Sequence, residues 1–254
     1  MNTLRRTLLA LGALALCAAA PLGAQAPDFT AMLKAIDSNG DFGTRDFSAV
    51  YTMVTQKPDT KDSVIQVKLF RRDDNNQMVW IMQKPDAQKG QGFLKVDENM
   101  WMYDPESGKF DHTTMKEQIQ NSKAKSSDLK RTSYADDYEI AGSAEGVLGK
   151  YPVWVLTLKA RNNEVSYPSL KLSIRKDKPL ALKEEDFSLS DRLMRTVYFP
   201  PTYIEIAGKT VPSQMLIVDE LNKGEKSQLS LSDVSVAALP DATFSKAFLS
   251  QSSR

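Results

Sequence analysis

The sequence predicts a mainly β protein, an antiparallel sheet with a few helices. Two observations carry this prediction. Apolar and polar residues alternate with a period of two in many short runs between Phe47 and Val236, which is typical of half-buried strands. Short turn sequences such as Lys176-Asp177-Lys178-Pro179 and Asn222-Lys223-Gly224 separate the runs, and connections this short join antiparallel neighbours. We therefore expect a meander of about eleven to thirteen strands.

Residues 1–24 have the three-part layout of a secretory signal peptide. Arg5 and Arg6 precede an apolar run over residues 8–20, and small residues follow it. The run is shorter than the ~20 residues that span a bilayer, which favours a cleaved leader over a retained membrane helix. We expect cleavage after Ala24 or Ala26 and export to the periplasm. The remaining residues, 25–254, are expected to form a single domain.

The only cysteine, Cys17, lies inside this leader. A lipoprotein anchor at Cys17 is an alternative, but such signals carry a small residue before the cysteine, and here it is Leu16. The exported chain has no cysteine, so its fold must depend on its core. Of 33 basic residues, Arg5 and Arg6 leave with the leader, so 31 balance 32 acidic ones. This balance gives no electrostatic reason to expect nucleic acid as a partner.

One helix is expected at the start of the exported chain. Apolar residues recur there at i, i+3, i+4 and i+7, namely Phe29, Met32, Leu33 and Ile36. Asp28 is the expected N-cap and Asn39-Gly40 the expected end. The apolar stripe either packs into an ordinary core or lies across the mouth of a groove.

Strands are expected at twelve places along the chain. They cover residues 47–55, 64–72, 78–83, 92–96, 100–103, 153–159, 170–175, 180–189, 194–199, 203–207, 211–220 and 228–236. Residues 113–137 interrupt the meander with a polar, lysine- and serine-rich stretch, in which Ser126-Ser127-Asp128 could cap a short helix. An interruption of this length is either disordered or a functional lid. Phe244, Ala247 and Phe248 indicate a short closing helix.

The sequence offers no catalytic residues, no metal site and no cofactor motif. His112 is the only histidine, and without exported cysteines no zinc ligand set can be assembled. Gly142-Ser143-Ala144-Glu145-Gly146 has its serine one place too early for a nucleophile elbow. Asp37-x-Asn39-x-Asp41 lacks the glycine and glutamate of a calcium loop. In Glu184-Glu185-Asp186, strand alternation sends neighbours to opposite faces, so we expect no catalytic pair there. The protein is therefore predicted not to be an enzyme.

Soft apolar residues gather between positions 78 and 115. They are Met78, Met82, Met100, Met102 and Met115, with Trp80, Phe93, Leu94, Trp101 and Tyr103. Methionine is flexible and polarisable, so it suits surfaces that accept ligands of variable shape. Any single member is better explained as core. The cluster as a whole gives the sheet more apolar surface than the few expected helices can cover.

Several motifs, in this order, resemble the LolA-like outer-membrane lipoprotein-sorting proteins. They are Trp80-Ile81-Met82-Gln83-Lys84-Pro85, residues 90–94, residues 97–105, Ser126-Ser127-Asp128-Leu129, Asp136-Asp137-Tyr138, residues 151–158, Arg195-Thr196-Val197-Tyr198-Phe199, Leu239-Pro240-Asp241 and Phe244-Ser245-Lys246. The resemblance covers essentially all of the exported chain. The chain departs from it in being longer than LolA proper. It is also polar at Asn121-Ser122-Lys123-Ala124-Lys125, where relatives are rich in glycine and methionine.

The resemblance implies an unclosed β-barrel, a half-barrel whose helices form a lid over a hydrophobic groove. Residues 28–37 would be the lid helix and residues 113–137 a further lid or rim. The candidate groove residues are Met32, Leu33, Ile36, Trp80, Met82, Leu94, Met100, Met102 and Phe199. A shift of one residue in any strand would exchange its two faces, so these positions depend on the register.

The resemblance also implies a function in the periplasm. The chain would bind acyl chains of lipoproteins or other lipids and shuttle them toward the outer membrane. Its partners would include an inner-membrane transporter and an outer-membrane acceptor. The alternative is a periplasmic adaptor, whose sheet edge or groove binds a protein and works with an inner-membrane transporter.

Overall fold

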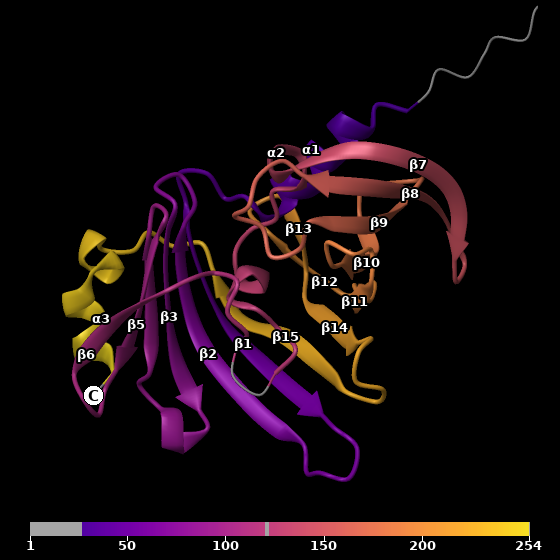
Figure 1. The fold of residues 1–254 in the computed structure, drawn as a ribbon. Helices are drawn as coiled ribbons and strands as arrows, with labels where there is room; N and C mark the ends of the chain where they lie inside the picture. The colour runs from indigo at the N-terminus through magenta and orange to yellow at the C-terminus, as the bar shows by residue number, and fades with distance from the viewer. Residues whose placement is uncertain (1–26, 120–121, 254) are drawn as a thin grey trace, which may run out of the picture.

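A computed structural model describes residues 27–119 and 122–253 of the chain, so the expected leader, residues 1–24, lies outside the described residues. Thirteen strands form one antiparallel sheet in the order β6-β5-β4-β3-β2-β1-β15-β14-β11-β10-β9-β8-β7. β6 and β7 are its two edges, so the curved sheet does not close (Figure 1). The predicted mainly β, unclosed half-barrel with helices is confirmed.

The strands follow one another with few interruptions. Their bounds are β1 Asp46–Gln56, β2 Ser63–Arg72, β3 Gln77–Lys84, β4 Gly92–Val96, β5 Asn99–Asp104, β6 Lys109–Thr113, β7 Tyr138–Leu148, β8 Tyr151–Ala160, β9 Ser169–Arg175, β10 Ala181–Phe187, β11 Leu193–Tyr198, β12 Tyr203–Ile206, β13 Lys209–Pro212, β14 Gln214–Asp219 and β15 Lys226–Ser235. β12 and β13 pair only with each other and form a separate hairpin.

Two meanders make up the large sheet. The N-terminal meander runs from β1 to β6, and the C-terminal meander returns from β7 to β15. They meet where the first strand pairs with the last, for example at Tyr51↔Leu231 and Met53↔Leu229. Because β6 and β7 lie at opposite edges, the chain between them must cross the whole sheet. We call residues 114–119 and 122–133, the described part of the chain that makes this crossing, the crossing segment.

Helix α1 (Phe29–Gly40) begins where the sequence predicts. The Asp28 Oδ1 accepts a hydrogen bond from the Ala31 amide at 2.9 Å and so serves as the N-cap. Leu33 and Ile36 pack against leucines of β8 and β9. Asp37, near the end of α1, accepts hydrogen bonds from two backbone amides at the start of the short helix α2 (Tyr134–Asp137). One carboxylate therefore ties α1 to α2.

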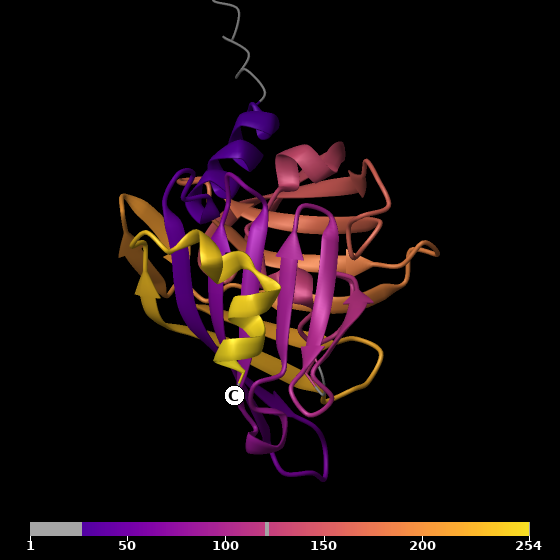
Figure 2. The ribbon, with the colours of Figure 1, turned by 90° about the vertical axis from the view of Figure 1, so that its left-hand side faces the viewer.

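Helix α3 (Lys246–Ser252) covers the outer, convex face of β3, β4 and β5 (Figure 2). It lies very close to the sheet at Gly92. A Cβ at this position would come within 2.2 Å of a Leu249 methyl carbon, so any larger residue would force the buried Leu249 side chain to move. The short 3-10 helix η3 (Asp241–Phe244) leads into α3 and adds Phe244 to the same cluster.

The crossing segment fills the concave side of the sheet between the two meanders (Figure 1). Its Ile119, Ala124 and Leu129 are 2%, 0% and 0% exposed and pack with the inward side chains of the N-terminal meander. The short 3-10 helix η2 (Ser126–Leu129) carries Leu129, at the place where the sequence predicts a capped turn of helix. The interior is therefore largely occupied by the protein's own chain. A second short 3-10 helix, η1 (Asp86–Gln88), follows β3.

The structure contains two strands that the sequence pattern does not predict, β6 and β7. In addition, one of the expected strands is divided into two. β7 was missed because Gly142 and Gly146 interrupt its alternation, and β6 because its five residues are mostly polar. The single strand expected over residues 211–220 is divided between β13 and β14, which belong to different sheets. β13 ends at Pro212, which has no amide hydrogen to continue a ladder.

Candidate functional site

Two neighbouring hollows, each of about 130 Å³, open beside the crossing segment on the concave side. Both take part of their walls from the end of the crossing segment and from two apolar side chains of the C-terminal half. The shared residues are Asp128, Lys130, Arg131, Thr132, Tyr134, Phe199 and Met215. Because Phe199 and Met215 belong to both, the two hollows are parts of one depression.

The apolar hollow lies beneath the C-terminal end of α1. Its hydrophobic wall consists of Ile36, Phe42, Phe47, Tyr51, Leu180, Ala181, Phe199, Val211, Pro212 and Met215. Phe42 and Phe47 stack with ring centroids 5.0 Å apart. Val211 and Pro212 come from the β12–β13 hairpin, which folds over the mouth of the half-barrel. A hydrocarbon group is the ligand that such a wall accepts.

Arg71 on β2 ties α1 to the sheet at the edge of the apolar hollow. Its Nη2 donates a hydrogen bond to the Gly40 carbonyl at 2.6 Å, and its Nε lies 2.6 Å from Asp73 Oδ1. The guanidinium also lies 4.8 Å from the centre of the Phe47 ring. These contacts hold the last turn of α1 over the hollow in the state that the structure describes.

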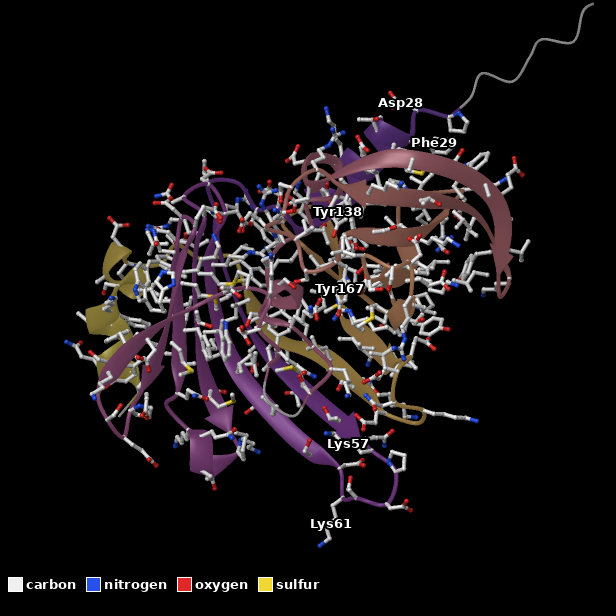
Figure 3. The ribbon with its side chains drawn as sticks, viewed as in Figure 1. Asp28, Phe29, Lys57, Lys61, Tyr138 and Tyr167 are labelled. Carbon is white, nitrogen blue, oxygen red and sulfur yellow. The ribbon has the colours of Figure 1, made fainter. Side chains whose placement is uncertain are left out.

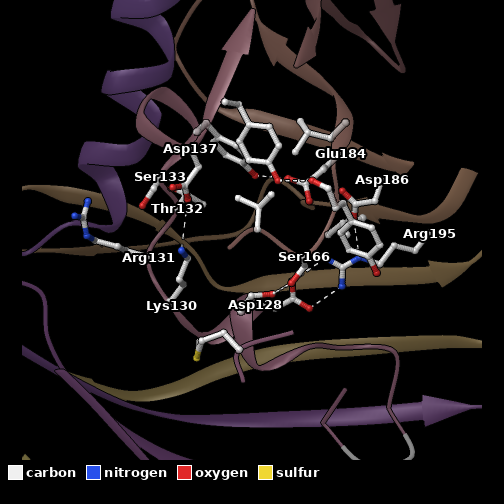
Figure 4. A pocket seen from close by; sticks show the side chains of 18 of the residues that line it. Asp128, Lys130, Arg131, Thr132, Ser133, Asp137, Ser166, Glu184, Asp186 and Arg195 are labelled. Carbon is white, nitrogen blue, oxygen red and sulfur yellow. Dashed lines mark hydrogen bonds and ion pairs between the residues drawn. The ribbon is translucent and has the colours of Figure 1, made fainter. Parts of the chain in front are cut away.

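The polar hollow lies between β10, β11 and the crossing segment, and ionisable groups surround it (Figure 4). Glu184 and Asp186 occupy alternate positions of β10, so both face inward, opposite Leu172 and Leu170 of β9. Asp186 Oδ2 accepts a hydrogen bond from Arg195 Nε at 2.6 Å. Arg195 also holds Asp128 through two parallel hydrogen bonds of 2.7 and 2.8 Å. This fork is the strongest tether between the crossing segment and the C-terminal meander.

Three tyrosines enclose the carboxyl pair. Tyr134 donates a short hydrogen bond to Glu184 Oε2, and Tyr138 donates to the Tyr167 carbonyl at 3.1 Å. Figure 3 shows Tyr138 and Tyr167 on the concave side of the C-terminal half. Burial raises the pKa of each of the three phenols, so all three remain neutral donors at pH 7.

The two neighbouring carboxyls, Glu184 and Asp186, differ in their pKa values and therefore in their charge. Burial raises the pKa of Glu184 well above its usual value, and the neighbouring Asp186 raises it further. Burial also raises the pKa of Asp186, but Arg195 opposes this by its charge and its hydrogen bond. The proton of the pair therefore belongs on Glu184, and Asp186 is the ionised partner of Arg195.

Two of the nine residues predicted to line a groove do line a hollow, namely Ile36 and Phe199. Met32 and Leu33 pack against β8 and β9 instead. The side chains of Trp80, Met82, Met100 and Met102 do face the concave side, but they pack into the core beneath the crossing segment. Trp80 is stacked on Phe93, with ring centroids 3.9 Å apart.

Leu94 lies on the other face of the sheet. It pairs with Val79, one position from the Trp80–Phe93 pair, so strand alternation turns it outward. There it packs with Leu249 and Phe244 at the C-terminus. The methionine–aromatic cluster is thus divided between two faces, and its outer part is covered by α3.

The residues of the polar hollow are the ones that the sequence reasoning missed. The adjacent residues Glu184 and Glu185 do face opposite ways, but Glu184 and Asp186 are two positions apart and share a face. Two acids at i and i+2 in a strand whose other inward residue is Leu182 were a usable signal. Arg195 was noted only as part of a motif.

Within residues 27–119 and 122–253, no three His, Cys, Asp or Glu side chains are grouped so as to hold a metal ion. None of the helices in this part of the chain has the length and apolar character needed to cross a membrane. His112, on β6, makes an edge contact with the Trp101 ring and stands apart from both hollows.

Comparison with known proteins places the fold. A family model described as "Uncharacterized protein" matches residues 74–251, and no curated protein matches the chain. A LolA superfamily protein from Nitrosomonas europaea is 22% identical, with a TM-score of 0.76 over 86% of this chain and 97% of its own. An outer membrane lipoprotein-sorting protein domain, as it is described, from Vibrio parahaemolyticus is 17% identical, with a TM-score of 0.75 over 87% and 97%. A DUF1329 family protein from Desulfovibrio piger is 18% identical, with a TM-score of 0.73 over 87% and 97%.

Proposed function

The chain belongs to the family whose model matches residues 74–251 and has the fold of the LolA superfamily, and from this premise we propose that it is a carrier of acyl chains. It would act in the periplasm after cleavage behind Ala24 or Ala26, and would bind lipid or lipoprotein tails without chemical change. One observation carries the proposal. An aromatic and aliphatic hollow lies on the concave side, roofed by the end of α1 and by the β12–β13 hairpin.

The hollow as described is too small for a whole acyl chain. A cavity of about 150 Å³ accommodates a benzene-sized group, whereas pockets for larger ligands measure roughly 300–1,000 Å³. The neighbouring space is filled by Ile119, Ala124 and Leu129 of the crossing segment. On this proposal, these side chains occupy the place that the tail takes when it binds.

The energies favour exchange of these side chains for a ligand. Burying a tail of roughly sixteen carbons is worth about 13 kcal/mol before the costs of binding, at ~0.8 kcal/mol per methylene. Exposing Ile119 and Leu129 again costs about 1.5–3 kcal/mol each. The crossing segment is thus apolar enough to keep the groove closed in water and too small to compete with a long tail.

Polar contacts at two places hold the crossing segment down. One is the fork between Arg195 and Asp128. At the other, Lys123 Nζ lies 2.6 Å from Asp219 Oδ2 and 2.5 Å from Glu225 Oε2. The amide of Lys123 also donates to Ser227 Oγ at 2.8 Å. When the segment lifts, water can hydrate the charged groups of both contacts, so the segment can be released and held again.

The direct test is to identify what co-purifies. The exported protein is isolated from periplasm, extracted and analysed for lipids by mass spectrometry, and the emptied protein is titrated with a fluorescent fatty acid. We expect acyl lipids in the extract and saturable binding. Phe199→Arg should abolish both, because Phe199 lines both hollows. Tyr198→Arg is the matched control, since Tyr198 is the exposed neighbour on the other face.

Lack of lipid in the extract together with lack of fatty-acid binding would contradict the carrier function. Lipid that is retained equally by Phe199→Arg and by the wild type would place the binding site elsewhere. No feature of the described residues favours the alternative of an adaptor that binds a protein partner.

A further inference from the structure

The polar hollow adjoins the place proposed for the tail and carries an excess of acidic groups. The following inference rests on the proposed function and assigns the chemistry of the ligand's other end. The carboxylates that line the polar hollow are Asp128, Asp137, Glu164, Glu184 and Asp186, and the cations that line it are Lys130, Arg131 and Arg195. Phe199 and Met215 connect it to the apolar hollow. A ligand that occupies both must be amphipathic.

The cations around the polar hollow already have anionic partners. Arg195 is shared between Asp128 and Asp186. Lys130 lies 3.5 Å from Asp137, and Arg131 lies 3.1 Å from Asp41. Lys125, close by, is held over the Tyr167 ring at 4.2 Å, and burial lowers its pKa. An anionic head group would have to break one of these pairs, so the site does not suit one.

The carboxyl pair, in contrast, can accept a further hydrogen bond from a ligand. Asp186 is 0% exposed, and its Oδ1 receives no hydrogen bond from a side-chain or backbone donor among the described residues. The neighbouring Glu184, which is 9% exposed and carries the proton of the pair, shares a side-chain hydrogen bond with Asp186. A buried acceptor of this kind is costly unless a donor serves it. The proton on Glu184 can exchange with solvent, so a hydrogen-bond donor of a ligand can take its place beside Asp186.

We propose that the polar hollow binds the protonated amine of an amphipathic ligand whose hydrocarbon tail lies in the apolar hollow. The ammonium donates hydrogen bonds to Asp186 Oδ1 and to a carboxylate oxygen of Glu184. The proton that Glu184 carried passes to solvent, so one positive charge enters the site as another leaves. No covalent bond is made or broken.

The groups that face Glu184 fit this exchange. From α2 and β7 come the phenols of Tyr134 and Tyr138, which stay neutral. The carboxylate of Asp37, at the end of α1, raises the pKa of Tyr134 further by its charge. Arg195 on β11 keeps its ion pair with Asp186 on the neighbouring strand throughout. The crossing segment contributes Asp128 and Lys125, which offset each other. The charge of the hollow is therefore the same before and after binding.

The test compares three ligands with one tail and different heads, namely dodecylamine, dodecanol and dodecanoate, each below its micelle concentration. Isothermal titration at pH 7 in two buffers of different ionisation enthalpy measures affinity and protons released together. We expect dodecylamine to bind roughly tenfold or more tightly than the other two, the size of one hydrogen bond to a charged group. Close to one proton should be released with dodecylamine and none with dodecanol.

Glu184→Gln keeps the shape and neutrality of the empty site but has no proton to release. In this variant the proton release should disappear and the preference for dodecylamine should fall to that for dodecanol. Glu185→Gln is the matched control, since Glu185 faces the other way and pairs with Lys183. It should bind like the wild type. Circular dichroism and thermal unfolding of both variants check that the fold is kept.

The outcomes separate the inference from the proposed function. Equal binding of the three ligands without proton release, or tighter binding of dodecanoate, overturns the amine site and leaves the acyl carrier intact. Failure of all three ligands to bind overturns both. An amine preference that survives in Glu184→Gln shows that the carboxyl pair does not provide it and overturns the assignment.

Discussion

The inner face of the half-barrel consists of two unlike regions. Under the N-terminal meander it is closely packed, with Met53, Leu69, Trp80, Met82 and Met100 buried beneath the crossing segment. The C-terminal meander borders two hollows, the apolar one shared with β1 and β2, and covers a buried cluster of carboxyls, phenols and a guanidinium. Packing stabilises the fold in the first region, whereas the second keeps open space beside buried ionisable groups. A ligand site is expected in the second.

The largest effect that this comparison predicts is on stability. Trp80→Ala should lower the free energy of unfolding by about 3–5 kcal/mol, because a large side chain is lost from a filled region. Phe199→Ala should cost clearly less, since Phe199 already borders hollow space. Urea unfolding monitored by circular dichroism measures both. Equal losses would mean that the two regions are packed alike.

A comparable but smaller loss is expected at the fork of the polar hollow. Arg195→Met leaves Asp128 and Asp186 without their cation, and breaking a buried pair in this way costs roughly 3 kcal/mol at pH 7. The loss should shrink in acid, where the carboxyls become protonated. The same unfolding measurement at pH 4 and pH 7 follows this. A loss that does not depend on pH would show that the charges are not the cause.

The third effect concerns Glu184 and pH. Because burial raises its pKa, the folded state holds the proton more tightly than the unfolded chain, whose value lies near 4.5. The stabilisation is complete below that pH and is lost as the pH rises toward the folded value. Glu184→Gln avoids this loss. At pH values above 4.5, the free energy of unfolding of this variant should therefore increase relative to that of the wild type, by up to about 1.4 kcal/mol for each pH unit.

Glu185→Gln is the control for that series, because it makes the same substitution on the opposite face of the same strand. Its stability relative to the wild type should stay nearly constant over the range. If both variants follow the same curve, the effect comes from net charge and not from the buried pair.

The smallest effect is kinetic. Lys123→Met removes the ion pairs of the crossing segment with Asp219 and Glu225, and should speed the uptake of a fluorescent fatty acid roughly twofold to fivefold, the range of a partly exposed ion pair. Stopped-flow fluorescence measures the rate. Lys226→Met, a change of an exposed lysine next to Glu225, should leave the rate unchanged. A slower rate in Lys123→Met would contradict a lid role for the segment.

Local patterns in the sequence predict much of the fold. The alternation in β1, β2 and β4 and the spacing of Leu33 and Ile36 in α1 follow from rules that act over a few residues. The order of strands does not, because the pairing of β1 with β15 joins residues about 180 positions apart. Which face of a strand looks inward is also decided by this pairing, and so Leu94 lies beneath α3.

The site was harder to predict for the same reason. The polar hollow forms only when β10, β11, α2 and the crossing segment meet, and Glu184 has a raised pKa only because that assembly buries it. The sequence does show the polar character of residues 113–137, yet the burial of Ile119, Ala124 and Leu129 depends on the shape of the trough that receives them.

Hydrogen–deuterium exchange of the crossing segment, with and without palmitate, tests the central claim most directly. In the closed state the amides of Ile119, Ser126 and Ser127 donate to backbone carbonyls within the segment. If a tail takes the place of Ile119, Ala124 and Leu129, peptides covering residues 114–133 should exchange faster when palmitate is bound, while those of β1 and β15 stay unchanged. Unchanged or slower exchange in the segment on binding would show that the tail does not displace it.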